Sequence, residues 1–146
     1  MVTLHRASTI LCVVGLMRVA VPGAAGVRAD RERAGQCAAL PKAEAVITVH
    51  GRLYGANGGG SGFRIWIVGT RRIVWLSPKI DPAVPDAIRN AFKPFDEEVY
   101  GDFDLVPLAP DRAGVMREVC FVSGEHLIVR DVRTGQSRTI MRHENR

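Results

Sequence analysis

The sequence has few residues of the kinds that build metal or cofactor sites. It holds four histidines and three cysteines in 146 residues, and no internal repeat or low-complexity tract. Beyond the N-terminal segment the histidines are His50, His126 and His143, and none has a second ligand at helical or hairpin spacing. We therefore expect no metal site, no cofactor and no repeat architecture.

Catalytic motifs are also lacking. The glycine-rich residues 55–62 have no following lysine and lead into an apolar, strand-like run, whereas a phosphate loop needs a helix at that point. Ser61 lacks the second glycine of a nucleophile elbow. Ser123 and His126 lie close in sequence, but no orienting acid or oxyanion hole accompanies them in the pattern. The sequence thus favours a protein that is not an enzyme.

Acidic residues are missing from residues 1–29, which hold three arginines. A short basic start, an apolar run over residues 7–17 and a small-residue pattern before Asp30 are typical of a signal peptide, with cleavage near Ala29. The alternative is an uncleaved anchor over residues 7–27, but Arg18 near its middle would be costly in a membrane. We predict a periplasmic or secreted protein whose mature chain has no transmembrane helix.

The basic charge of the chain comes largely from that segment. The formal net charge is +5, but without the three N-terminal arginines 17 basic residues face 15 acidic ones. A nearly balanced surface disfavours nucleic acid as a partner.

Two of the three cysteines, Cys37 and Cys120, remain after the signal segment. Disulfides persist in the compartments that exported proteins reach. We therefore expect these two to form a disulfide.

Alternating and apolar runs predict a small, mainly β domain over residues 45–142, after a loose lead-in over residues 30–44. Proline residues bound a short amphipathic helix over residues 85–93, in which Ile88 and Phe92 share a face. Turns are predicted at residues 123–124 and 134–135. The predicted strands cover residues 45–54, 63–69, 73–76, 99–108, 115–122, 127–132 and 137–141.

The element order is three strands, one helix, two strands and an extra hairpin. This is the order of an OB-type barrel, and a β-sandwich is the alternative. In an OB-type barrel the first and fourth strands can be neighbours. The domain is therefore expected to be a small closed or nearly closed β structure.

Strand alternation places two polar rows on strand faces that could meet. One outcome is cross-strand ion pairing of Arg52 with Asp104, and the other is a mixed-charge groove for a polar ligand or glycan. The candidate ligand-binding residues are His50, Arg52, Tyr54, Arg64, Tyr100, Asp102 and Asp104.

Two other functions remain open. A small hydrolase would use Asp102 with Asp104, or Asp104 with His50, because paired groups in different environments can divide acid and base roles. An OB-type face would bind oligosaccharide or oligonucleotide through Trp66 and Trp75, although Trp66 within an apolar run is expected in the core.

The chain also resembles a group of uncharacterised exported bacterial proteins. The resemblance rests on the pattern R-I-W-x-V-G-T-x-R at residues 64–72 and on G-x-M-R-x-V-C at residues 114–120. It implies an exported single domain and no particular chemistry. The function expected from the sequence is a non-enzymatic binding or envelope-associated module, with an envelope protein or a glycan as partner.

Overall fold

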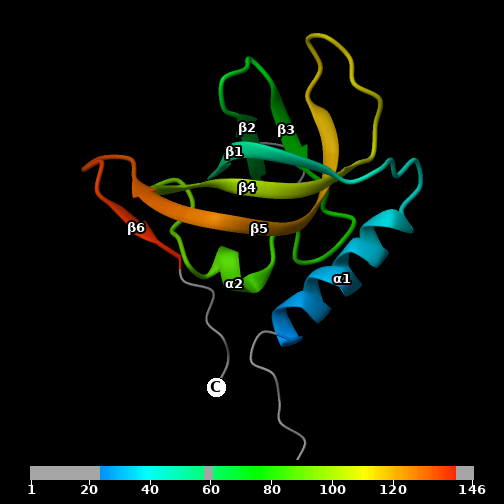
Figure 1. Ribbon diagram of the computed structural model, residues 1–146. Helices are drawn as coiled ribbons and strands as arrows, with labels where there is room; N and C mark the ends of the chain where they lie inside the picture. Colours follow the sequence, from blue (N-terminus) through cyan, green and yellow to red (C-terminus); the bar gives the residue numbers. More distant parts are fainter. Residues whose placement is uncertain (1–23, 58–60, 141–146) are drawn as a thin grey trace, which may run out of the picture.

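The computed structural model describes residues 24–57 and 61–140 (Figure 1). The expected signal segment up to residue 23 and the end of the last predicted strand lie outside the described residues. The elements in chain order are α1 (Ala24–Ala38), β1 (Ile47–Gly55), β2 (Phe63–Ile67), β3 (Ile73–Leu76), α2 (Asp86–Arg89), β4 (Glu97–Pro107), β5 (Arg117–Asp131) and β6 (Ser137–Thr139).

The strands form one sheet that closes into a ring. The order is β3-β2-β1-β4-β5-β6, and β3 also pairs in parallel with the start of β5, which closes the ring. All other neighbours are antiparallel. This arrangement confirms the predicted mainly β, barrel-like fold, including the helix between the third and fourth strands and the pairing of the first strand with the fourth.

The inner face of the ring is apolar because every second residue of each strand points inward. Leu53, Ile65, Val99, Phe103 and Leu105 are fully buried there. Phe103 lies 5.6 Å from Phe121, between ring centroids. These side chains fix which residues of each strand face outward.

Helix α2 lies over one opening of the ring (Figure 1). Ile88 and Phe92 are both buried in the main core, as the shared helical face predicted. The predicted helix over residues 85–93 is too long, however, because the helical segment ends at Arg89. Pro94 follows closely, and it cannot continue a helix hydrogen-bond ladder.

The expected loose lead-in is wrong, because residues 24–38 form helix α1, which packs beside β5 (Figure 1). The guanidinium of Arg33 donates hydrogen bonds to the carbonyls of Phe121 (2.7 Å), Pro82 (2.6 Å) and Ala83 (2.9 Å). The helix shows no broad apolar stripe in its sequence, so periodicity does not reveal it.

The predicted disulfide is present between Cys37 and Cys120, with the two Cα atoms 5.7 Å apart. Both cysteines lie in a second small core with Val106, Leu108 and Val122. Residues 30–44 are therefore attached to the domain. Cys37 and Arg33, which hold α1 to the barrel, lie after the predicted cleavage position at Ala29.

The turn predicted at residues 123–124 is wrong, because β5 runs without a break from Arg117 to Asp131. Two β-bulges on β5 each add one residue opposite β4, one near His126 and one near Val122. A bulged strand bends and twists more strongly. The long strand β5 can therefore pair with β4 along most of its length, with β3 at its start and with β6 near its end. The second predicted turn, at residues 134–135, is confirmed.

No helix within the described ranges is long and apolar enough to span a membrane.

Candidate functional site

The outward face of β2, β1, β4 and β5 carries most of the candidate residues. The β1–β4 register places His50 opposite Asp102, Thr48 opposite Asp104 and Arg52 opposite Tyr100. The two predicted polar rows therefore meet. Arg64 lies on the same face, because its register partners are Tyr54 on β1 and Trp75 on β3.

At the centre of this face two histidines share one carboxylate. The Nδ1 atom of His50 lies 2.9 Å from one oxygen of Asp102, and the Nδ1 atom of His126 lies 2.9 Å from the other. Hydrogen bonds from these imidazoles hold the pKa of Asp102 below its ordinary value, so this carboxyl group stays ionised. In a neutral imidazole whose Nδ1–H donates to Asp102, the Nε2 atom is an acceptor.

A β-bulge puts His126 in this position. Its φ is +52°, in the left-handed region that side chains other than glycine rarely adopt. The extra residue in β5 at this point turns the imidazole toward β4, where it reaches Asp102. Bulges often redirect a side chain beside a functional site, and backbone outliers are concentrated at such sites.

A second shared carboxylate lies next to the first. Asp104 accepts a hydrogen bond from the hydroxyl of Thr48 (2.6 Å) and another from Ser123 (2.9 Å). The expected ion pair between Arg52 and Asp104 is therefore wrong. The histidines contact Asp102, so the predicted pairing of Asp104 with His50 is not formed either.

Arg52 pairs instead with Glu98, at 3.1 Å. Its guanidinium carbon lies 5.2 Å from the ring centroid of Tyr54 and 5.1 Å from that of Trp66, so it is held between two aromatic rings. The hydroxyl of Tyr100 donates to the same Glu98, at 3.2 Å. The Nε atom of Arg52 is buried and has no partner among the described residues.

The expectation that Trp66 lies in the core is wrong. Trp66 and Trp75 are both partly exposed, and the register places them on the outward face with Arg64. The indole of Trp66 donates to the carbonyl of Thr70 (2.8 Å), which fixes the ring against the β2–β3 turn. The apolar run around Trp66 concealed an alternation in which only its neighbours Ile65 and Ile67 face inward.

Sequence reasoning missed four members of this face: Thr48, Glu98, Ser123 and His126. Thr48 and Glu98 follow the same alternation as the predicted residues and could have been found from it. Ser123 and His126 could not, because the sequence around them is that of a turn. Within residues 24–57 and 61–140, no three histidine, cysteine or acidic residues are arranged to hold a metal ion.

Comparisons of the chain with known protein families, curated proteins and solved structures find no match. The predicted resemblance to uncharacterised exported proteins therefore stays a prediction.

Proposed function

We propose that the protein is an exported, non-enzymatic binding module that recognises a polar ligand, with a glycan as the ligand class. The outward face of β2, β1 and β4 is the binding surface. The observation that carries the proposal is the mixture of partly exposed aromatic rings with hydrogen-bonding groups on this single face. Trp66, Tyr54 and Tyr100 supply rings, and Asp102, Asp104 and the histidines supply donors and acceptors.

This combination suits a sugar because a pyranose offers both apolar C–H faces and hydroxyl groups. Rigid aromatic rings give contact area at low entropic cost, and carboxylates accept hydrogen bonds from hydroxyl groups. OB-type barrels bind oligosaccharides and oligonucleotides on the face of their second and third strands, and β2 belongs to the surface proposed here, which supports the proposal as an analogy of fold alone. The carboxylates of Glu98, Asp102 and Asp104 line up along β4 and oppose a phosphate backbone, which favours the glycan.

The export part of the proposal rests on the N-terminal pattern and on the disulfide. A chain that starts near Asp30 would still contain Arg33 and Cys37 and so would keep the contacts of α1. Intact-mass analysis of protein recovered from the cell envelope tests this part. A recovered chain that still begins at Met1 would contradict it.

The binding part is tested by calorimetric titration with soluble peptidoglycan fragments and with neutral oligosaccharides. Trp66→Ala should weaken binding at least about fivefold, since stacking contributes about 1–3 kcal/mol per ring in comparable platforms. Phe95→Ala is the matched control, because Phe95 is 63% exposed and is an aromatic residue outside this face. Equal binding by both variants and the unmodified protein would contradict the proposal.

An acid–base enzyme is the second candidate, and the arrangement of His50, Asp102 and His126 is the observation that favours it. A carboxylate that orients an imidazole leaves the distal nitrogen free to accept a proton. Hydrolysis of 4-nitrophenyl esters and glycosides should then fall at least a hundredfold in both His50→Ala and His126→Ala. Turnover that is absent, or that both variants keep, would exclude this candidate.

A further inference from the structure

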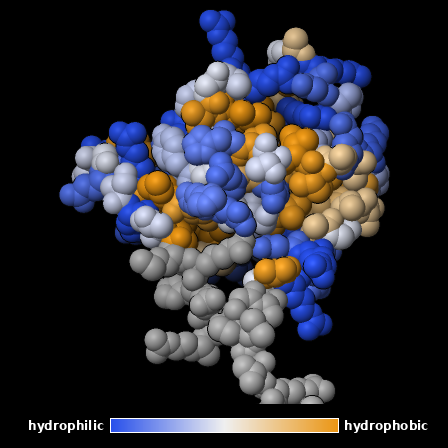
Figure 2. Space-filling view, in the orientation of Figure 1, coloured by the Kyte–Doolittle hydropathy of each residue, from blue (hydrophilic) through white to orange (hydrophobic). Residues whose placement is uncertain are grey.

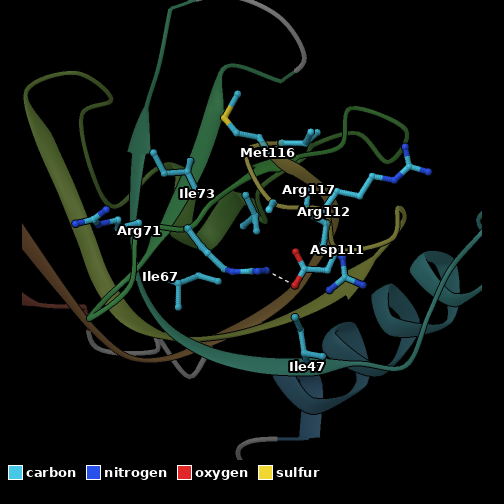
Figure 3. Close-up of a pocket in the computed structure, with 13 residues that line it drawn as sticks. Ile47, Ile67, Arg71, Ile73, Asp111, Arg112, Met116 and Arg117 are labelled. Carbon is cyan, nitrogen blue, oxygen red and sulfur yellow. Dashed lines mark hydrogen bonds and ion pairs between the residues drawn. The ribbon is translucent and has the colours of Figure 1, made fainter.

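A separate pocket lies at one end of the ring, away from the polar face of β1 and β4. It is formed between the β2–β3 turn and the loop that joins β4 to β5, both at the top of Figure 1, and it has a volume of about 320 Å³. This volume lies at the lower end of the range of about 300–1,000 Å³ that small-molecule sites occupy. Figure 3 shows Ile67 and Ile73 on the left of the pocket, Met116 at the top, Asp111 on the right and Ile47 below Asp111.

The lining of the pocket is apolar at its base. Ile47, Ile67, Ile73 and Val74 come from the ends of three strands. Val115 and Met116 continue this surface at the rim and are 65% and 42% exposed. Large apolar side chains left open to solvent beside a cavity mark a binding surface.

The rim of the same pocket is strongly basic. Arg71 and Arg72 lie on the β2–β3 turn, and Arg112 and Arg117 lie on the other side, with Asp111 as the single acid among the lining residues. Figure 2 shows hydrophilic residues at the top of the molecule, over these two loops, and hydrophobic surface directly below them.

Two of the four arginines are already engaged. Arg72 forms an ion pair with Asp111 across the pocket, which the dashed line in Figure 3 marks, and Arg117 pairs with Glu44 at 2.7 Å. Arg71 and Arg112 have no ion pair or side-chain hydrogen bond to any residue that the structure describes. The rim therefore has positive charge in excess of its acids.

Local hydrogen bonds and a glycine turn shape the two loops that form the rim. Thr70 accepts a hydrogen bond at its hydroxyl from the backbone of Arg72 (3.0 Å) and donates to Ile67 (2.7 Å). The opposite loop turns at Gly114, whose φ of +75° is one that glycine adopts without strain. The basic rim is thus held over the apolar base.

We propose that this pocket binds a small amphiphilic anion, a medium-chain alkyl carboxylate, with the chain on the isoleucine base and the carboxylate at the arginine rim. Arginine suits this role because its planar fork donates two parallel hydrogen bonds to a carboxylate. The ligand carboxylate takes the place of Asp111 as a partner of Arg72 and also engages Arg112. The inference does not depend on the glycan proposal, because the two surfaces share none of the residues on which either proposal rests.

Calorimetric titration of the full chain with hexanoate, octanoate, decanoate and octanol tests the proposal. Each added methylene group that enters the pocket should tighten binding about fourfold, until the base is full. Octanol should bind at least tenfold more weakly than octanoate, and added salt should narrow that difference because it screens the arginines. Octanol binding as tightly as octanoate, or no binding of any alkyl chain, would overturn the proposal.

Variants of the rim separate a binding role from a structural one. Arg112→Ala should weaken octanoate binding several-fold, whereas Asp111→Asn should strengthen it about two- to fivefold, because the competing carboxylate of an exposed pair is removed. Arg130→Ala is the matched control, since Arg130 is an exposed arginine on β5 outside the pocket lining. If the affinity for octanoate changes in the same direction in the Arg112 and Asp111 variants, the assignment is overturned.

Anionic lipids also join a negatively charged group to alkyl chains. Co-sedimentation with phosphatidylglycerol vesicles distinguishes the two sources. Vesicle binding without octanoate binding would overturn the small-ligand proposal in favour of a membrane surface. Octanoate binding in the absence of vesicle binding would support it.

Discussion

The two faces of β1 and β4 differ completely, although they are built from alternate residues of the same two strands. Inward, Leu53, Val99 and Phe103 are fully buried. Outward, His50 and Asp102 have side chains that are 61% and 40% exposed, and they contact each other. A slip of one residue would exchange the faces, so the apolar inner face fixes the register that brings the outer polar pairs together.

The comparison predicts that the two faces have different roles. Inner residues should determine stability, and outer residues should determine what the protein binds. The substitutions below test this difference, from the largest expected effect to the smallest.

Phe103→Ala should cause the largest loss, about 3–5 kcal/mol in the free energy of unfolding, because it opens a cavity in the main core. Urea unfolding measures the effect. Ile128→Ala, on the outer face of β5, is the control and should change stability by less than about 0.5 kcal/mol. Equal effects of the two substitutions would show that the inner face does not dominate stability.

Cys120→Ser should lower stability by about 2–5 kcal/mol, as is typical when a small exported domain loses its disulfide. This substitution tests whether the attachment of α1 contributes to the free energy of unfolding, as the packing of the strands does. Cys37→Ser should give the same result. Peptide mapping under non-reducing conditions that finds two free thiols would contradict the prediction.

Gly101→Ala should lower stability by about 1–3 kcal/mol through overpacking. A Cβ atom at Gly101 would lie 2.5 Å from a methyl group of Leu127 and 2.7 Å from the carbonyl oxygen of Glu125. Gly35→Ala in α1 is the matched control, because nothing lies within 4 Å and alanine favours the helix there. If Gly101→Ala unfolds with the same free energy as the unmodified protein, the β4 and β5 backbones move apart at this point without a measurable cost.

Asp102→Asn should have the smallest effect on stability at neutral pH and should change the dependence of stability on pH. The histidine hydrogen bonds lower the pKa of Asp102 in the folded protein. Asp102 therefore stabilises the fold above its unfolded pKa of about 3.9, and this contribution is lost as pH falls through the folded value. Urea unfolding from neutral to acidic pH should show a flatter acid decline in the variant; identical profiles would contradict the prediction.

Most of the architecture follows from the alternation of apolar and polar residues along each strand. This alternation can be found in the sequence without knowing which strands are neighbours in the sheet. The outward placement of His50, Arg52 and Asp102 was predictable for this reason. The partners of these residues were not, because a pair depends on the register between two distant segments. Arg52 lies opposite Tyr100 and reaches Glu98, whereas the sequence suggested Asp104.

Helix α1 and strand β5 show where sequence reasoning fails. Ser123 and Gly124 are a common turn pair, yet a bulge lets them continue a strand. Helix α1 has little apolar periodicity because it is held by one disulfide and by the hydrogen bonds of Arg33. Both features depend on tertiary contacts, which local composition does not encode.

The attachment of α1 also has a consequence for the order of folding. An isolated helix of 15 residues is marginal in water, and the partners of α1 at Cys120 and Phe121 are made late in synthesis. The parallel β3–β5 pairing likewise joins segments far apart in the chain. Completion of the fold therefore waits for β5, and until that strand emerges α1 lacks its disulfide and its Phe121 contact, and the ring lacks the pairing that closes it.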